Sequence, residues 1–418
     1  MADASRFDVV VVGAGPAGLT AAFSAARRTS SVAIVDQAEH VGGQIWRRDV
    51  SEGYPRNKRW LVDAVGERAT FIGGATVVDA TTTGGRHELL LEKAGRSFRV
   101  QTGTLILATG ARELFLPFHG WTLPGVVGVG GLQALMKSGL DVRGKRIVIS
   151  GTGPLLVAVA ATAVKRGADV TAVVEQASWG SMMGFGLQLA ARPLTALEAL
   201  THLQQLGAGV LKIGWWVTEA VGTNSVERVV VSDGESRVSV DCDILCTGFG
   251  LVPNTELARR LGCAVGPRGV EVDGRQRTTI PGIFAAGEAT GIAGVDSAMK
   301  EGTMAGIIAT TDSSGHAVSH RPRSSSWERI LERTFTLRPE VVALARPDTI
   351  VCRCEDVRLG DIDPAWSARQ AKLYARAGMG ACQGRVCGAA LQRIFGWSTD
   401  SVRPPLQPTT VSSLLGAS

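Results

Sequence analysis

The sequence predicts an α/β protein with two parallel-sheet units and a small C-terminal domain. Three observations predict this. An apolar, β-branched run at 7–12 ends in glycine and leads through an alanine-rich helical stretch to a second apolar run at 31–37. The same order of strand, glycine turn and helix recurs from residue 145. Four cysteines fall within the last 70 residues. A strand–helix–strand unit of about 30 residues makes its strands parallel, with a right-handed crossover.

Composition and charge narrow the class of protein. The chain has 418 residues, enough for about three domains of roughly 150 residues each. Hydrophobic residues make up 45% of it, which excludes wholesale disorder. The net charge is +6, but no block of lysine and arginine of the nucleic-acid-binding kind occurs. No apolar stretch reaches 18 residues, and the N-terminus lacks the features of a signal peptide. We therefore expect no transmembrane segment and a cytoplasmic protein.

The segments between the two units predict how each is completed. From 71 to 101, short alternating runs separated by glycine turns predict an antiparallel meander. The strand-like segments TLILATG (104–110) and DILCTGFGLVPN (243–254) close the first and the second unit. The segment TTIPGIFAAGEAT (278–290) precedes a glycine- and alanine-rich helix, and a polar stretch at 312–326 predicts a linker.

The first glycine-rich turn predicts a dinucleotide site. Its motif, G-x-G-x-x-G, is formed by Gly13, Ala14, Gly15, Pro16, Ala17 and Gly18. The first glycine allows the tight turn, the second lets backbone amides approach a pyrophosphate, and the third allows the helix to pack closely on the strand. The helix N-terminus favours phosphate. Asp36 ends the next strand and can accept a hydrogen bond from a ribose hydroxyl.

The second glycine-rich turn departs from this pattern. Gly151, Gly153 and Pro154 keep the first part of the motif, but Leu156 stands where the third glycine is expected. That glycine serves packing of helix against strand rather than contact with phosphate. Glu175 ends the following strand and could bind a ribose. Three interpretations stay open for this site: NAD, another adenine nucleotide such as ATP, or a scaffold without ligand.

The C-terminal cysteines predict a metal site. Cys352 and Cys354 form a C-x-C pair, and Cys382 and Cys387 form a C-x4-C pair in a glycine-rich loop. Four thiolates suit zinc or a [2Fe–2S] cluster. The remaining cysteines, at 242, 246 and 263, are expected to be small buried residues. No nucleophile–base pair or carboxylate pair stands at a recognisable spacing, so no catalytic residue is assigned.

Residues 5–310 resemble flavoproteins with two dinucleotide-binding domains, in which an NAD-like domain is inserted into an FAD domain. The resemblance implies FAD at the first site. Besides the first glycine loop, the segments GGQ (42–44), ATG (108–110) and IFAAGE (283–288) carry the resemblance. The further residues that it implies bind FAD are Asp36, Gln37, Gly43, Gln44, Ala108, Thr109, Gly110, Gly287 and Glu288. In that family an aspartate occupies the place of Glu288 and binds the ribitol. The extra methylene of glutamate displaces the carboxylate, so that contact does not carry over directly.

The C-terminal segments VCRCEDV and GMGACQGRVCG resemble the [2Fe–2S] domain related to bacterioferritin-associated ferredoxin. The resemblance implies that the four C-terminal cysteines bind such a cluster. It also implies four parts of the chain: a discontinuous FAD domain (1–115 and 247–312), an NAD-like Rossmann domain (116–246), a linker (313–330) and the [2Fe–2S] domain (331–418).

As a whole, the chain resembles the FAD-binding α subunits of bacterial heteromeric amine and imino-acid dehydrogenases, a group that includes opine oxidases, D-hydroxyproline dehydrogenase and the hydrogen cyanide synthase flavoprotein. The segment HGWTLPGVVGVGGLQ (119–133) adds to the likeness. The resemblance implies an electron-transfer subunit of a dye-linked dehydrogenase. A partner β subunit would oxidise the C–N bond of an amino acid, imino acid or opine. It allows an FMN at a subunit interface and a small ferredoxin-like third subunit.

Two other functions stay open at this point. One is a self-contained NAD(P)H-dependent flavin and iron–sulfur oxidoreductase. The other is a scaffold subunit that holds a nucleotide and a cluster for structural reasons. The substrate, the terminal electron acceptor and the stoichiometry of subunits are not encoded in any motif.

Overall fold

The computed structural model describes residues 5–207, 209–312, 326–398 and 402–415. The chain forms two compact units, each assembled from separate segments. Unit 1 takes residues 1–112, 252–323 and 400–418, and unit 2 takes residues 113–251 and 324–399. The chain passes between them at two short paired strands, β7 (Ala111–Glu113) and β16 (Leu251–Pro253).

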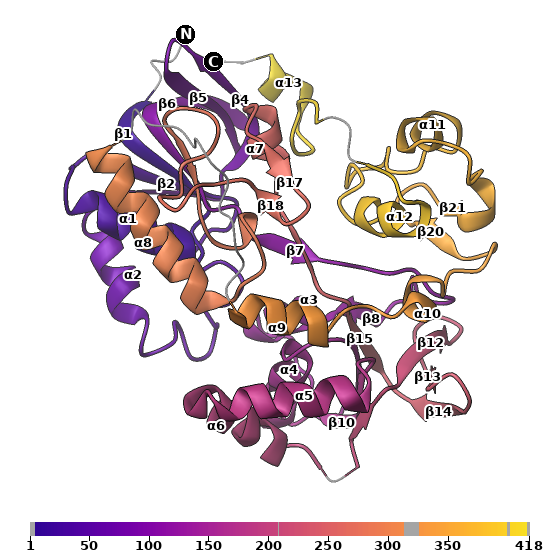
Figure 1. Ribbon diagram of the computed structural model, residues 1–418. Coiled ribbons are helices and arrows are strands. Elements are labelled where there is room, and N and C mark those ends of the chain that lie inside the picture. Colours follow the sequence, from indigo (N-terminus) through magenta and orange to yellow (C-terminus); the bar gives the residue numbers. More distant parts are fainter. Residues whose placement is uncertain (1–4, 208, 313–325, 399–401, 416–418) are drawn as a thin grey trace. The chain divides into compact units, whose positions relative to one another are not determined.

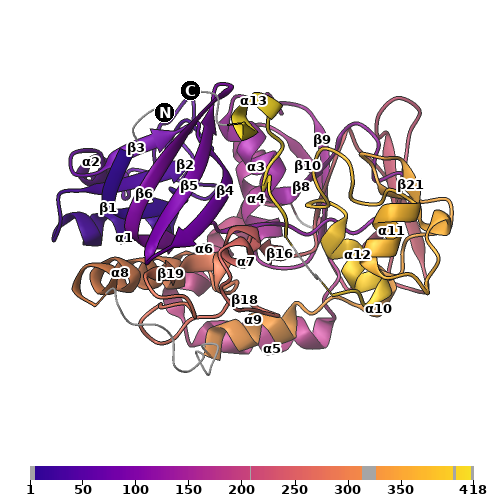
Figure 2. The ribbon, with the colours of Figure 1, turned by 90° about the horizontal axis from the view of Figure 1, so that it is seen from above.

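Unit 1 is built on a seven-stranded sheet (Figure 2). Six strands follow the order β3-β2-β1-β6-β5-β4, and the seventh, β19, pairs with β6. Its strands are β1 (Ser5–Val12), β2 (Val32–Asp36), β3 (Thr70–Gly73), β4 (Thr76–Thr83), β5 (Arg86–Lys93), β6 (Arg96–Leu107) and β19 (Ile283–Ala285). The strands β1, β2, β3 and β19 are parallel to one another and to β6, whereas β4, β5 and β6 form the predicted antiparallel meander. The parallel arrangement of the first unit is confirmed.

The central strand β1 explains why the sequence begins with an uninterrupted apolar run. Its last four residues, at 9–12, are all buried, because β1 lies between β2 and β6 with both faces covered. The helices of unit 1 are α1 (Pro16–Ala26), α2 (Arg59–Gly66), α7 (Glu256–Arg260), α8 (Val295–Thr311) and α13 (Val411–Leu414), with the short strands β17 (Val265–Gly266) and β18 (Gly269–Val270) and the 3₁₀ turn η1 (Gly287–Ala289).

Helices α1 and α8 lie side by side on this sheet (Figures 1 and 2). Glycine makes their close approach possible. A Cβ atom on Gly302 would lie 2.1 Å from the carbonyl oxygen of Ala17, and one on Gly306 would lie 2.2 Å from that of Ala21. The two backbones therefore touch, and the glycine- and alanine-rich composition of α8 serves packing against α1.

Unit 2 contains a five-stranded parallel sheet with the order β11-β10-β9-β15-β8. Its strands are β8 (Val126–Gly128), β9 (Arg146–Gly151), β10 (Asp169–Glu175), β11 (Leu211–Ile213) and β15 (Ile244–Gly248), and a separate antiparallel sheet contains β12 (Trp216–Val221), β13 (Arg228–Ser232) and β14 (Arg237–Asp241). Helices α3 (Val129–Lys137), α4 (Leu155–Lys165), α5 (Trp179–Ala190) and α6 (Pro193–Gln204) complete this part. The predicted second βαβ unit is confirmed.

The later part of unit 2 begins with α9 (Ser326–Thr334), which packs along α5 (Figures 1 and 2). The elements that follow are α10 (Pro339–Val342), β20 (Ile350–Cys352), β21 (Val357–Arg358), η2 (Leu359–Asp361), α11 (Ala368–Tyr374) and α12 (Gly388–Phe395). Residues between 345 and 397 share a small core of their own that includes Val351, Ile362 and Leu391. Most of the predicted linker, residues 313–325, lies outside the described residues.

Candidate functional site

The first glycine turn has the backbone geometry that the sequence predicts. Gly13 has φ +107°, and a Cβ atom on it would lie 2.1 Å from the carbonyl oxygen of Ala108. A Cβ atom on Gly18 would lie 1.7 Å from the carbonyl oxygen of Gly13. Gly15 faces Gly43, whose Cβ would lie 2.8 Å from the Cα of Gly15. The turn therefore requires glycine for close contact between backbones.

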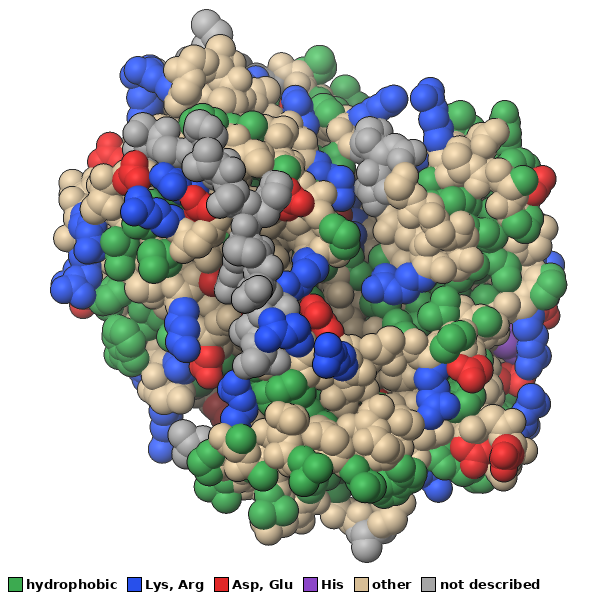
Figure 3. Space-filling view, viewed as in Figure 1, with side chains coloured by type: hydrophobic (Ala, Val, Ile, Leu, Met, Phe, Trp, Pro, Cys, Tyr) green, Lys and Arg blue, Asp and Glu red, His purple; other side chains and the backbone are tan. Residues whose placement is uncertain are grey.

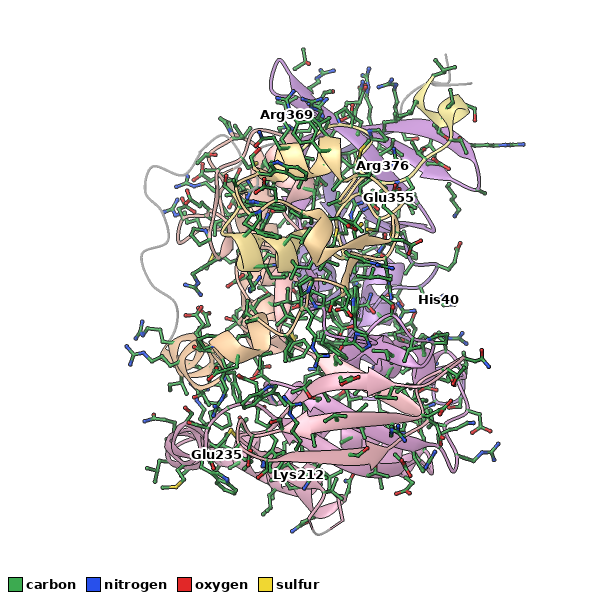
Figure 4. All side chains as sticks on the ribbon, turned by 90° about the vertical axis from the view of Figure 1, so that its right-hand side faces the viewer. His40, Lys212, Glu235, Glu355, Arg369 and Arg376 are labelled. Atoms are coloured by element: carbon green, nitrogen blue, oxygen red, sulfur yellow. The ribbon has the colours of Figure 1, made fainter. Side chains whose placement is uncertain are left out.

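Asp36 holds the turn in place from the end of β2. One carboxylate oxygen accepts a hydrogen bond from the Ala14 amide at 2.6 Å, and the other accepts one from the Ala38 amide at 2.7 Å. The carboxylate is half-buried. Gln37 is exposed beside it. His40, which follows on the same loop, is also exposed (Figure 4).

A pocket opens beside this turn, and its lining comes from segments that are far apart in the sequence. Its lining residues are Gly15, Pro16, Ala17, Ile45, Ala108, Gly110, Ala286, Glu288, Gly294, Val295 and Ala298. The structure thus brings together parts of the glycine turn, the ATG segment and the acid of the IFAAGE segment. The other residues predicted for FAD, among them Asp36, Gly43, Gln44 and Thr109, do not line this pocket.

Two helix N-termini meet at the pocket. Pro16 and Ala17 begin α1 after the N-cap Gly15, and Val295 begins α8 after the N-cap Gly294. Neither N-cap side chain bonds the first turn, because both are glycine. The exposed amide ends of two helices favour an anion or an electron-rich group. The contribution of α8 was not predicted from the sequence, although a glycine before a long helical run, here Gly294 with φ +86°, is a signal for such a helix start.

The ATG segment is fixed by Asn254, which sequence analysis did not single out. The Thr109 hydroxyl donates to the carbonyl oxygen of Asn254 at 2.7 Å, and the Asn254 side-chain amide donates to the carbonyl oxygen of Thr109 at 2.9 Å. The Asn254 backbone amide donates to the carbonyl oxygen of Gly110 at 2.9 Å. Thr109 therefore serves to position the turn at Gly110, which lines the pocket.

Two glutamates stand at the end of β19. Glu288 lines the pocket, and burial raises the pKa of its carboxyl group. Glu301, a buried residue of α8, accepts hydrogen bonds from the Gly287 amide and from the Thr290 hydroxyl, each at 2.9 Å. Glu301 therefore positions the turn that presents Glu288. The sequence pattern predicted Glu288 as a site residue but gave no signal for Glu301.

The second glycine turn has similar backbone geometry but a different surrounding. Gly151 has φ +149° and Gly153 has φ +102°. Glu175 ends β10 and is only 4% exposed. Its carboxylate accepts hydrogen bonds from the Thr152 hydroxyl and the Ala177 amide at 2.8 Å and from the Gly153 amide at 2.7 Å. Burial raises the pKa of Glu175. Both oxygens of the Glu175 carboxylate thus accept hydrogen bonds from the protein itself.

A later segment of the chain crosses the same strand end. The buried side chain of Gln176 donates to the Thr152 hydroxyl at 3.0 Å and to the carbonyl oxygen of Thr336 at 3.1 Å. Its side-chain oxygen accepts from the Arg338 amide at 3.0 Å. The Arg338 side chain donates to the carbonyl oxygen of Gln176 at 2.7 Å. These hydrogen bonds therefore hold residues 336–338 against the end of β10, where the second site would bind a ribose.

The four C-terminal cysteines gather around two loops. Cys352, in β20, shares a hydrogen bond with Cys387, which lowers the pKa of the Cys352 thiol to about 6. Cys354 likewise shares a hydrogen bond with Cys382. The Gly378 amide donates to the sulfur of Cys352 at 3.4 Å. Within the described residues, no group of three or more histidine, cysteine, aspartate or glutamate side chains stands in a metal-binding arrangement.

The other cysteines behave as expected. Cys242, Cys246 and Cys263 are buried as free thiols, and burial raises the pKa of Cys242 to about 12 and of Cys263 to about 11. None of these three thiols lines the pocket. The prediction that they are small core residues is confirmed.

Comparison with known proteins places this site in a family. Residues 7–302 match the pyridine nucleotide-disulphide oxidoreductase family. The chain belongs to this family. It is an oxidoreductase with the α/β flavoprotein fold of Rossmann-type domains, and the family supports a flavin as its cofactor.

Relatives and solved structures extend the likeness beyond residue 302. The chain is 33% identical to hydrogen cyanide synthase subunit HcnB of Pseudomonas aeruginosa, over 94% of this chain and 92% of that protein. It is 30% identical to an opine oxidase subunit from Rhizobium meliloti, over 98% of both chains. Its fold matches L-proline dehydrogenase from P. horikoshii with a TM-score of 0.69 and 19% identity, over 99% of this chain and 81% of that one.

No helix among the described residues is long and apolar enough to cross a membrane, as the sequence predicts. The cytoplasmic location stays a prediction.

Proposed function

We propose that this protein is the FAD- and [2Fe–2S]-carrying electron-transfer subunit of a heteromeric dehydrogenase. In this proposal a partner β subunit oxidises the C–N bond of an amino acid, imino acid or opine, and this chain receives the electrons. Two relatives that align with almost the whole chain carry names of enzyme subunits, one of an opine oxidase and one of hydrogen cyanide synthase. Their names support both the partner and the substrate class.

The pocket of unit 1 fits FAD. Gly15 and Gly43 bring two backbones together where a pyrophosphate would need room for close approach. The N-termini of α1 and α8 would stabilise its phosphates and the electron-rich edge of the flavin. Glu288 would supply a half-buried carboxyl, whose pKa is raised by burial, for a hydroxyl of the ribitol. When bound, FAD would supply the two-electron acceptor.

Four thiols carried by two loops supply the type of ligand that a [2Fe–2S] cluster needs, although the described side chains do not stand in a metal-binding arrangement. Cys352, Cys354, Cys382 and Cys387 would be its ligands, and two hydrogen-bonded thiol pairs already gather them. The Gly378 amide is directed at the sulfur of Cys352, which is the kind of bond that tunes such clusters. When bound, the cluster would exchange single electrons.

One observation favours this function over that of an NAD(P)H-dependent enzyme. The ribose-binding end of the second dinucleotide fold is filled by the protein itself. Glu175 is only 4% exposed, whereas Asp36 at the first site is half-buried. Gln176, beside Glu175, is hydrogen-bonded to Thr336 and Arg338. A pyridine nucleotide would have to displace these bonds, and a buried group left unpaired costs about 1–3 kcal/mol. We infer that electrons do not enter from NADH.

A single experiment on the purified chain tests these assignments. We expect the absorption spectrum of a flavin together with an iron–sulfur cluster, and about one FAD, two irons and two sulfides per chain. Under anaerobic conditions, NADH should leave the flavin of the chain oxidised. The amino acid, imino acid or opine substrate should bleach it only in the complex with the partner subunit.

Other results would select the alternatives. Rapid bleaching of the isolated chain by NADH or NADPH would establish the self-contained oxidoreductase. Release of ATP or ADP without flavin, or zinc in place of iron, would establish the scaffold. The FMN at a subunit interface and the small ferredoxin-like subunit stay predictions, and released FMN or a third co-purified polypeptide would support them.

A further inference from the structure

Helices α5 and α6 turn their large apolar side chains away from their own unit. In α5, Trp179, Met183 and Leu187 are 63%, 68% and 78% exposed. In α6, Leu197 and Leu200 are 61% and 51% exposed. Figure 3 shows hydrophobic side chains gathered over these two helices at the foot of the view. We call the five residues the α5–α6 face.

The helical periodicity shows that this exposure is an ordered stripe. Trp179, Met183 and Leu187 follow one another at every fourth position and so share one side of α5. Phe185, about half a turn away from Met183 and Leu187 at 3.6 residues per turn, packs inward against Trp327 and Phe335 with ring centroids 5.7 and 5.1 Å apart. The helix therefore has an inner aromatic contact and a second, outward apolar stripe.

In α6 the usual arrangement is reversed. The half-buried side is formed by Ala196, Ala199 and His202, whereas Leu197 and Leu200 point outward. A surface helix of a monomer normally places its large apolar residues toward the core and its polar residues toward water. The larger hydrophobic residues of α6 thus face a position that no described residue of the chain fills.

The face carries almost no charge. Residues 177–206 contain one arginine and one glutamate. The arginine, Arg192, lies over the ring of Trp327 at 4.5 Å, and the glutamate, Glu198, lies 3.9 Å from His202. Arg192 thus lies against an aromatic ring, and Glu198, whose side chain is 73% exposed, adds one outward charge. Helices that lie on membranes carry lysine and arginine on their polar side, so this composition favours a protein partner over a lipid surface.

We propose that the α5–α6 face is the docking surface for the partner subunit of the complex. This inference rests on the proposed function, since it requires a permanent partner. Five side chains that expose roughly 100 Å² of apolar surface each give on the order of 500 Å², which is a large part of the about 800 Å² that one partner contributes to a stable interface. Permanent complexes bury apolar, weakly charged faces of this kind.

Glycines in α5 point to close packing by the partner. Gly184 and Gly186 have open space where a Cβ atom would stand. Each glycine in a helix costs about 1 kcal/mol relative to alanine, and α5 has no residue that is fully buried within the chain. A partner that packs against α5 would supply the stability that the helix lacks by itself.

The test compares the complex with the isolated chain. The tagged full-length chain is purified from its native host with the subunit that accompanies it, and hydrogen exchange is measured for peptides across residues 178–206 in the complex and in the chain made alone. We expect exchange of these peptides to slow at least tenfold in the complex. Equal exchange in both forms would overturn the proposal.

A matched pair of variants makes the test specific. The double variant Leu187→Glu, Leu200→Glu should lose at least nine-tenths of the accompanying subunit while keeping its FAD content and circular dichroism. The control Leu135→Glu changes a side chain that is 45% exposed on α3 of the same unit and should keep the subunit. Retention of the subunit by the double variant would refute the proposal.

Other occupants would give different results. Dimers of the isolated chain in light scattering that the double variant dissociates would assign the face to a second copy and overturn the proposal. Flotation of the isolated chain with phosphatidylglycerol vesicles, abolished by the double variant, would assign it to lipid and overturn it too. Absence of any accompanying subunit would refute the proposed function itself, whereas a subunit bound equally by all variants would refute only the α5–α6 face.

Discussion

The Cδ2 atom of Leu156 lies 3.4 Å from the position that a Cβ atom on Gly248 would take. In the first unit the corresponding contact joins Gly18 and Ala108, again at 3.4 Å from the Cβ position of the glycine. The second unit thus moves the glycine from the helix to the neighbouring strand. A large residue at the third position of the motif is accommodated because β15 ends in glycine, and α4 still packs into the core through Leu156.

This exchange predicts the effect of filling the space at Gly248. In Gly248→Ala the new methyl group would lie 2.9 Å from Cγ2 of Val129 and close to Leu156. Overpacking of a core costs about 1–3 kcal/mol, so the free energy of unfolding in urea should fall by that amount. Gly103→Ala is the control, because a Cβ atom on Gly103 has nothing within 4 Å. Equal stability of the two variants would contradict the assignment.

The first glycine turn predicts a loss of FAD. Gly43→Ala places a methyl group 2.8 Å from the Cα of Gly15, so the backbones must separate where the pyrophosphate would bind. We expect the FAD content per chain to fall at least tenfold after purification. Gly84→Ala is a matched control: Gly84 has φ +58° and Gly43 φ +59°, but Gly84 stands in open space. Both variants carry the same backbone strain of about 1–2 kcal/mol. Equal FAD contents would therefore count against the contact.

Glu288 predicts a pH dependence of stability in the chain stripped of FAD. Burial raises the pKa of its carboxyl above the value in the unfolded chain. The folded state then holds the proton more tightly, so this group lowers stability as the pH rises from the unfolded pKa to the raised pKa. Glu288→Gln removes the loss. The variant should gain stability over the natural chain as the pH is raised, measured by urea unfolding between pH 4 and 8.

A surface glutamate provides the comparison for Glu288. Glu235→Gln removes the same charge at an exposed position (Figure 4). Its stability relative to the natural chain should not follow the rise seen for Glu288→Gln. A constant difference in stability between Glu288→Gln and the natural chain at every pH would show that Glu288 is not destabilised by burial.

Glu301 predicts a positioning effect on the flavin pocket. Glu301→Ala leaves the Gly287 amide without the carboxylate that accepts its hydrogen bond, and a buried polar group left unpaired costs about 1–3 kcal/mol. The Thr290 hydroxyl loses one of its two acceptors and keeps the carbonyl oxygen of Gly287. The turn that carries Glu288 should loosen, and the dissociation constant for FAD should rise about tenfold or more. Glu301→Gln keeps one acceptor oxygen and should show a smaller rise. Unchanged FAD binding in Glu301→Ala would exclude the positioning role.

The sequence predicted those features that depend on the backbone and on neighbours in the chain. Gly13 and Gly18 are recognisable because only glycine fits their turn, and Asp36 because it ends a strand at a fixed distance from that turn. The parallel direction of the strands followed from the apolar runs and from the short helical crossovers between them. The burial of Cys242 and Cys246 followed from the strand-like run that they flank.

Contacts between distant segments could not be predicted. Gln176 and Arg338 meet although 162 residues separate them, and no periodicity signals that bond. The N-terminus of α8 reaches the pocket only because Gly302 and Gly306 let α8 lie against α1. The grouping of residues into the two units also depends on contacts between distant segments. The sequence therefore did not show that residues 324–399 belong with 113–251, or that 400–418 belong with the first unit. The predicted domain boundaries themselves stay predictions.

The loops around the C-terminal cysteines predict which glycine the cluster needs. A Cβ atom on Gly380 would lie 2.3 Å from the Cβ of Cys354, so Gly380→Ala must push the two cysteine-bearing loops apart. Iron per chain and the visible absorption of the cluster should fall at least fivefold. The FAD content should stay the same, because Gly380 belongs to unit 2 and the FAD pocket to unit 1.

Gly388→Ala is the matched control for Gly380→Ala. Gly388 follows the proposed ligand Cys387, begins α12, and has nothing within 4 Å of its Cβ position. Alanine there favours the helix by up to about 1 kcal/mol and should leave the iron content unchanged. Loss of FAD together with iron in Gly380→Ala would indicate general unfolding, and equal iron in both variants would show that the two loops do not enclose a cluster.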